Sequence, residues 1–172
     1  MEHHFLAFDI GASSGRAILG SLRNNRLQLT EVHRFTNQMQ LLHGHYFWNI
    51  YSLFEELKAG LKKCIQEHGV QPLSIGIDTW GVDYALITRD GYLTGLPFAY
   101  RDHRTDTSME EFFQVLGKED TYRLSGIQFM QFNTIFQLFS SVREDYSGLK
   151  VADDILFTPD VLNFMFSGIR KI

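Results

Sequence analysis

A lone carboxylate stands next to a run of small residues near the start of the chain. Asp9 closes an apolar segment over 5–10, and Gly-Ala-Ser-Ser-Gly-Arg follows at 11–16. A phosphate group needs backbone N–H groups that converge without bulky side chains, and Gly, Ala and Ser allow that approach. The serine hydroxyls and Arg16 can add further hydrogen bonds. Two interpretations remain open on these residues alone: a phosphate-binding loop, or a plain hairpin whose turn needs small residues.

The placement of Asp9 favours the functional interpretation. At the end of an apolar strand it is expected to be buried, and an unpaired buried carboxylate is costly. Mg²⁺ favours carboxylate ligands and keeps some of its water, so Asp9 is the candidate metal ligand. The segment is neither a Gly-Lys-Ser/Thr phosphate loop nor a G-x-G-x-x-G dinucleotide motif.

A second group of polar residues follows the apolar segment over 73–78. The sequence Asp-Thr-Trp-Gly-Val-Asp covers 78–83. Trp80 can pack on the apolar face of a sugar ring, and the two carboxylates can accept hydrogen bonds from its hydroxyls. Gly81 would let a ligand approach the backbone. A tight turn with a core tryptophan and solvated acids is an equally simple interpretation, and spacing alone slightly favours it.

Two further segments are dense in hydrogen-bonding groups. Tyr-Arg-Asp-His-Arg-Thr covers 100–105, and Gln and Asn alternate with aromatic residues over 125–134. Each can orient a polar ligand, although a solvated loop or a helix entry explains them too. Among the histidines, His43 and His45 are too close for two helical ligands, and no third ligand is evident.

The composition of the chain excludes several classes of protein. The chain has 172 residues, 44% of them hydrophobic, a formal net charge of −4 and one cysteine, Cys64. Without a basic cluster, nucleic acid is not expected as a partner. An intrachain disulfide and a cysteine-based zinc site are excluded. No signal peptide or membrane-length apolar run is visible, so a cytoplasmic protein without a membrane partner is expected.

Hydrophobic periodicity predicts a mixed α/β arrangement. The expected strands cover 5–10, 16–22, 26–35 and 73–78, with a hairpin over 82–93 turning at Asp90-Gly91. Helices are expected from Asn49 or Ser52 to Gly69, over 107–117, 118–124 and 133–144, and from 158 to 168. Three antiparallel strands, a helix and a returning strand open a ribonuclease H-like or actin-like domain, a mixed sheet with helices on its faces. No strand follows the last helix, so this domain is expected to be incomplete at its C-terminal end.

These segments, in this order, resemble the FGGY family of carbohydrate kinases. The matching stretches are FDIGASSGR, WNIYSL, SIGIDTWGVDYALI, GLPFAYRDHRT, SGIQFMQFNT and FTPDVLNFMFSG. They extend over almost the whole chain, and the best match is to the branch that acts on L-rhamnulose. The resemblance implies ATP and Mg²⁺ as cofactors, and transfer of the γ-phosphoryl group to the 1-hydroxyl of that sugar. Kinases for L-fuculose or xylulose, and a binding module without catalysis, remain alternatives.

The resemblance also implies residue roles. It assigns phosphate binding to Ala12, Ser13, Ser14, Gly15 and Arg16, and a position near metal and phosphates to Asp9. It assigns sugar contacts to Thr79, Trp80, Gly81 and Asp83, with Arg101, Gln131 and Asn133 as further pocket positions. The family's general base lies in a His-Asp-Thr segment of a second domain, and this sequence contains no such segment. The chain is therefore expected to be a truncated N-terminal domain over 1–172 that is inactive alone, its base lying beyond Ile172.

Overall fold

The computed structural model describes residues 2–171, which form two compact units. The first unit combines the described residues of 1–39, 49–81 and 158–172. The second combines 40–48 with 82–157. The first unit contains one sheet and the second contains two, and each unit has its own apolar interior.

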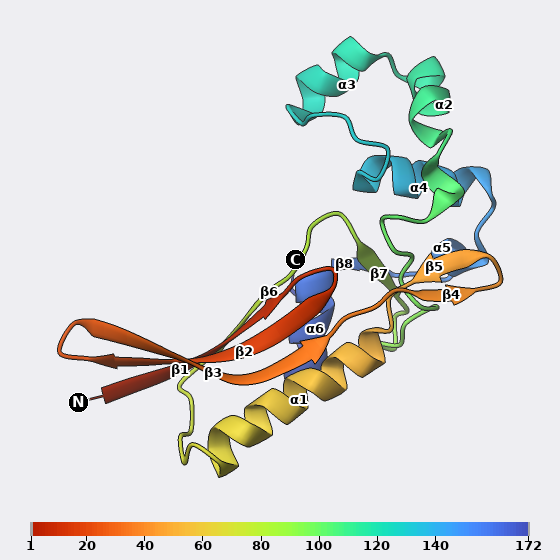
Figure 1. Ribbon diagram of the computed structural model, residues 1–172. Coiled ribbons are helices and arrows are strands. Elements are labelled where there is room, and N and C mark those ends of the chain that lie inside the picture. The colour runs from red at the N-terminus through yellow and green to blue at the C-terminus, as the bar shows by residue number, and fades with distance from the viewer. Residues whose placement is uncertain (1, 172) are drawn as a thin grey trace. The chain divides into compact units, whose positions relative to one another are not determined.

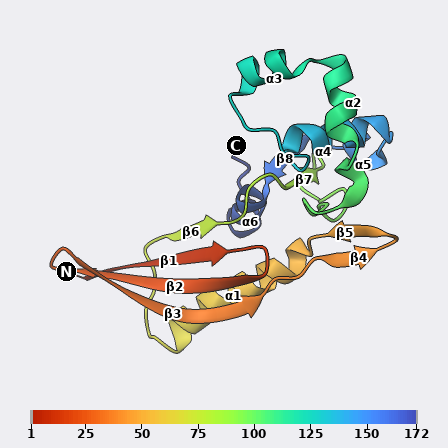
Figure 2. The same cartoon turned by 45° about the horizontal axis from the view of Figure 1, so that its top comes forward.

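A four-stranded sheet forms the centre of the first unit (Figure 2). It consists of β1 (Glu2–Ile10), β2 (Ser14–Arg23), β3 (Arg26–Thr36) and β6 (Ile75–Asp78), in the order β3-β2-β1-β6. The first three strands are antiparallel neighbours, and β6 joins β1 in parallel. Asn24 and Asn25 connect β2 to β3 with φ angles of 50° and 59°, as a tight hairpin turn requires.

Alternation along β1 separates two faces of this sheet. Leu6, Phe8 and Ile10 are at most 2% exposed and form the core face. Helices α1 (Ile50–Gln66) and α6 (Thr158–Ser167) pack on that face (Figure 1), where the ring of Phe166 stacks on Phe8 at 6.3 Å. Asp9 belongs to the opposite, outer face. The expectation that Asp9 is buried is therefore wrong, because the core side of the strand is taken by its even-numbered neighbours.

The second unit contains two two-stranded antiparallel sheets and several helices. Its elements are β4 (Gln40–Leu42), β5 (His45–Phe47), β7 (Tyr84–Ile87), η1 (His103–Thr105), α2 (Ser108–Val115), α3 (Lys118–Ser125), α4 (Thr134–Arg143), α5 (Ser147–Lys150) and β8 (Asp154–Phe157). β4 pairs with β5, and β7 pairs with β8, both antiparallel. The ring of Phe136 contacts Phe112, Phe113 and Phe129, which joins α2, α4 and the segment before α4 in one aromatic core.

Most predicted elements are confirmed within one to three residues. The three-strand meander, the returning parallel strand and all five predicted helices are present. The predicted turn at Asp90-Gly91 exists, with Gly91 N donating to Thr88 O at 2.9 Å, but the main partner of β7 is β8. No local pattern in the sequence predicted β4, β5, α5 or β8. No described helix has the length and apolar character needed to span a membrane.

Candidate phosphate- and sugar-binding sites

The segment between β1 and β2 is a tight turn that a neighbouring residue holds in place. Gly11 N donates to Ser14 O at 2.8 Å and closes the turn. Asn37, which directly follows β3, donates from its backbone to Ser13 O and from its side chain to Gly11 O, both at 2.9 Å. Asn37 is only 5% exposed. The turn that carries Ala12 is therefore fixed from outside the hairpin, as a preorganised backbone site for an anion would be.

Four charged residues form a row across the outer face of the sheet, next to this turn. The registers pair Arg34 with Arg16, Arg16 with Asp9, and Asp9 with Asp78. Cross-strand partners share a face of the sheet. Two cations on β3 and β2 thus stand beside two carboxylates on β1 and β6, at the carboxyl ends of the parallel strands.

Asp9 and Arg16 form an ion pair within this row. The Nε and Nη2 atoms of Arg16 donate to Oδ2 of Asp9 at 2.9 and 2.7 Å. The side chains of Arg16 and Asp9 are 45% and 47% exposed. Such an exposed pair contributes about 0–1 kcal/mol to stability, so its partners can be exchanged at low cost.

A pocket of about 290 Å³ opens over the same residues. It is lined by Asp9, Gly11, Ser14, Gly15, Arg16 and Arg34. Arg34 is a residue that sequence reasoning missed. It forms an ion pair with Glu31, and hydrogen bonding from Arg34 lowers the pKa of the Glu31 carboxyl. Two arginines, each held by a carboxylate, thus reach the pocket beside the small-residue turn.

Gly15 has a structural reason to be glycine. A Cβ atom at this position would lie 2.2 Å from Cζ and 2.5 Å from Cε2 of Phe35. Gly15 lies on the core face of β2, opposite Ile10, and Phe35 packs over it. The lack of a side chain therefore serves packing of the sheet, while the residue still lines the pocket.

The donor set at Asp9 fits a magnesium ion. Both hydrogen bonds from Arg16 fall on Oδ2, and Oδ1 accepts none from the described residues. The carboxylate is half exposed and faces an open pocket, which leaves room for retained water. Mg²⁺ is usually bound by one or two carboxylates together with water and substrate phosphates. Asp9, with Asp78 in register beside it, offers that environment.

The turn after β6 supplies the first group of predicted sugar residues. Thr79 and Trp80 are half-buried, Gly81 is exposed, and Thr79 Oγ1 donates to Trp80 O at 2.9 Å. A Cβ atom at Gly81 would meet no other atom within 4 Å, and its φ lies outside the left-handed region. Nothing in the described structure therefore requires glycine at this position, which leaves ligand approach as a reason for it.

Asp83 has a different position from the one expected. It is 0% exposed, and its carboxylate accepts hydrogen bonds from Trp48 Nε1 at 2.6 Å, Tyr100 N at 3.1 Å and Gln137 Nε2 at 2.9 Å. The expectation that it receives hydrogen bonds from a sugar is corrected, because these buried donors enclose it. Asp83 instead fixes Tyr100 and Gln137 within the second unit.

Val82, next to Asp83, has a strained backbone. Its φ is 71°, in a region that β-branched residues rarely adopt. Thr134 Oγ1 donates to its carbonyl at 2.8 Å and Gln137 Nε2 at 3.3 Å. Strain of this kind costs about 1–3 kcal/mol and is concentrated at functional sites. This observation favours a binding turn over the plain structural turn that the sequence also allowed.

The remaining predicted sugar residues are polar and surface-facing. Arg101 is exposed and its guanidinium lies 5.4 Å from the ring of Tyr100, which in turn meets Phe132 at 5.7 Å. Gln131 and Asn133 flank Phe132, and Gln131 Nε2 donates to Asp106 at 3.3 Å. Within the second unit, Arg101 and Phe132 thus both lie against the ring of Tyr100, and Gln131 and Asn133 are the sequence neighbours of Phe132.

Residues 4–171 match the sequence profile described as the FGGY family of carbohydrate kinases, N-terminal domain. The chain belongs to the FGGY family. It is 44% identical over 168 residues to a rhamnulokinase of Bacteroides thetaiotaomicron and 45% identical over 166 residues to one of Halalkalibacterium halodurans. These alignments cover 98% and 96% of this chain but 34% and 35% of the two relatives. The chain thus spans about a third of the length of the curated relatives it matches.

Solved structures confirm the predicted fold. A gluconate kinase from Lactobacillus acidophilus superposes with a TM-score of 0.85 over 99% of this chain and 34% of its own, at 12% identity. A xylulose kinase from Rhodospirillum rubrum gives 0.81 over 99% and 36%, at 17% identity. The mixed β3-β2-β1-β6 sheet with its helices is the actin-like fold of FGGY kinases.

Two residues of the FGGY loop region lacked a local signal in the sequence. Arg34 lies eighteen positions after Arg16 and reaches the pocket only through the pairing of β2 with β3. Asn37 is one polar residue at a strand end, and its role depends on its hydrogen bonds to the turn. The hairpin turn at 24–25 does not by itself predict that Arg16 and Arg34 share a face, because an unbroken register would pair Arg16 with His33. The two arginines share a face because the register shifts by one residue between Ala17 and Ile18, which no local pattern indicates.

Proposed function

We propose that this chain supplies the phosphate-binding loop and sugar-contacting residues of an ATP-dependent kinase that phosphorylates the 1-hydroxyl of L-rhamnulose. The observation that carries the proposal is the pocket where Asp9, Arg16 and Arg34 meet a turn of small residues, in a chain of the FGGY family. Relatives named rhamnulokinase, at about 44% identity over nearly the whole chain, support the choice of sugar. A cytoplasmic location is part of the proposal.

The phosphate side acts through an exchange of partners. Backbone N–H groups over 12–15 and the hydroxyls of Ser13 and Ser14 bind phosphate oxygens. Arg16 leaves Oδ2 of Asp9 for the phosphates, since a bidentate guanidinium–phosphate pair is strong. The carboxylate of Asp9 would be the group that holds Mg²⁺, together with retained water. That ion supplies neutralisation of the charge on the phosphoryl oxygens.

Each unit carries candidate sugar-contacting residues. In the first unit, Gly81 lets the sugar approach the backbone, with Thr79 and Trp80 beside it. In the second, Arg101, Gln131 and Asn133 donate hydrogen bonds to hydroxyl groups. Asp83 acts through others, because its carboxylate fixes the backbone of Tyr100 and the amide of Gln137.

We further propose that the 172-residue chain does not catalyse transfer alone. The resemblance places the general base in a His-Asp-Thr segment, which this sequence lacks. Phosphoryl transfer depends on positioning both substrates in a closed site, so phosphate binding by itself is insufficient. An ADP-release assay with Mg-ATP and L-rhamnulose is expected to show no turnover above the rate without sugar. Sugar-dependent ADP release would refute this part.

Intrinsic fluorescence tests the choice of sugar. The chain has two tryptophans, of which Trp48 is 0% exposed and Trp80 lies in the proposed sugar turn. L-Rhamnulose is expected to change the emission in a saturable manner and at lower concentration than L-fuculose or D-xylulose. A stronger response to either comparator would assign the chain to another FGGY sugar. Phosphate binding without any sugar response would favour a nucleotide-binding module.

A further inference from the structure

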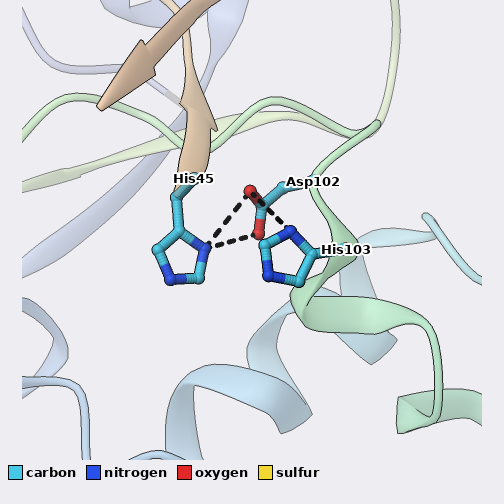
Figure 3. Close-up of side chains that lie close together, drawn as sticks. All are labelled: His45, Asp102 and His103. Carbon is cyan, nitrogen blue, oxygen red and sulfur yellow. Dashed lines mark hydrogen bonds and ion pairs between the residues drawn. The ribbon is translucent and has the colours of Figure 1, made fainter. Parts of the chain in front are cut away.

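Three side chains with metal-ligating atoms meet in the second unit, away from the phosphate loop (Figure 3). His45 Nδ1 lies 3.0 Å from Oδ1 and 3.3 Å from Oδ2 of Asp102. His103 Nδ1 lies 3.9 Å from Oδ2 of the same carboxylate. The ligand atoms of the three residues are all within 4.8 Å of one another. The two imidazole rings stack with their centroids 5.0 Å apart and an angle of 8° between their planes.

Asp102 is a preorganised anionic anchor in this cluster. Its side chain is 1% exposed, and Tyr46 N donates to Oδ2 at 2.7 Å while Arg104 N donates to Oδ1 at 3.0 Å. A carboxylate offers about four lone-pair positions, and these two backbone donors use two of them. The remaining positions face the imidazoles. Hydrogen bonds that orient a ligating carboxylate in this way increase metal affinity.

The histidines leave the cluster open on one side. The side chain of His45 is 37% exposed and that of His103 is 61% exposed. A buried anion under two accessible imidazoles lets an ion enter from solvent and retain a water ligand. We propose that His45, Asp102 and His103 form a binding site for a divalent transition metal ion, with Zn²⁺ as the natural occupant.

The donor set determines the class of metal. Imidazole nitrogen with a carboxylate oxygen suits Zn²⁺ and its neighbours, whereas Mg²⁺ and Ca²⁺ require oxygen ligands. Tetrahedral ligands about 2.0–2.1 Å from zinc lie about 3.3 Å from one another. The pair His45–Asp102 already has that spacing. The exposed ring of His103 has to move about 0.6 Å closer to Oδ2 and also turn, because two nearly parallel stacked rings do not direct their nitrogen lone pairs at one ion.

Metal binding would join two segments that are distant in the sequence. His45 belongs to β5, and Asp102 and His103 lie at the start of η1, nearly sixty residues later. The ion would bridge these two segments through the three side chains. It would stabilise the β4–β5 hairpin against opening. The site does not depend on the proposed kinase function.

Titration calorimetry of the 172-residue chain with ZnCl₂ tests the site. One zinc ion per chain is expected, with a higher melting temperature in its presence. His103→Gln and His45→Gln should each weaken this binding by at least about tenfold, as loss of a ligand or of its support does. His68→Gln is the matched control, since His68 is an exposed histidine just after α1 in the other unit.

Absorption of bound Co²⁺ gives a second readout that a general loss of stability would not produce. Intense visible bands of a four-coordinate site are expected in the unchanged chain and in His68→Gln, and they should disappear in His103→Gln. The proposal is overturned if the unchanged chain binds no Zn²⁺. It is equally overturned if the His45 and His103 variants bind zinc as tightly as the His68 control.

Discussion

Gly15→Ala separates the packing role of this residue from its proposed role beside phosphate. The new Cβ would lie 2.2 Å from Cζ of Phe35, about 1.2 Å closer than the roughly 3.4 Å of ordinary contact. Phe35 is 6% exposed, so its ring can move only by disturbing the core face of the sheet. Overpacking of this kind costs about 1–3 kcal/mol. For a chain of this size, each kcal/mol lowers the melting temperature by about 2–4 °C.

Thermal unfolding followed by circular dichroism measures this effect. Gly11→Ala is the control in the same turn, because its Cβ would come no closer than 3.4 Å to Ser14 O. Its melting temperature should match that of the unchanged chain. Phe35→Leu, added to Gly15→Ala, should recover part of the loss, since neighbouring sites are not additive. The reasoning is refuted if Gly15→Ala melts like the unchanged chain while retaining the same fold.

Three further predictions concern the sugar turn, the buried acid and the second arginine. Gly81→Ala should leave the melting temperature unchanged, because the new Cβ would meet no atom within 4 Å. The same variant should weaken L-rhamnulose binding by about tenfold, or 1.4 kcal/mol. Equal affinity of the variant and the unchanged chain would refute the argument that glycine is needed for ligand approach. Asp83→Ala removes the carboxylate that accepts hydrogen bonds from Trp48, Tyr100 and Gln137, and it should lower the free energy of unfolding by about 3 kcal/mol. Asp90→Ala is the control at an exposed position and should change the free energy of unfolding little. Carboxyl NMR titration should show the depressed pKa of Glu31 rising toward its ordinary value when tripolyphosphate draws Arg34 away, and an unmoved pKa would exclude that exchange.

Local patterns were enough to predict the sheet of the first unit. Asn24-Asn25 specifies the hairpin turn, and apolar alternation specifies the strands on either side. The elements that were missed are short and depend on distant partners. β4 is three residues long and wholly exposed, so it has no alternation to detect. β8 pairs with β7 across about seventy residues, which no local period can indicate.

The candidate site could be predicted only in part, because some of its residues also depend on partners that are distant in the sequence. The small-residue turn and the acid beside it are adjacent in the sequence, so their proximity follows from the chain itself. The face of the sheet on which Asp9 lies could also have been predicted, because Asp9 alternates with the apolar residues Leu6, Phe8 and Ile10. In contrast, Arg34 and the donors around Asp83 depend on strand register and on α4, which lie outside any local window.

Calorimetry with magnesium tripolyphosphate tests the central claim, that the turn and its arginines bind phosphate. This probe carries the phosphate chain without a nucleoside, so it needs only the first unit. One molecule is expected to bind per chain, with affinity lowered at least about tenfold, or 1.4 kcal/mol, in Arg16→Gln. Arg26→Gln removes the same charge from the far end of β3 and should have little effect. The account is contradicted if no binding occurs, or if Arg26→Gln weakens binding as much as Arg16→Gln.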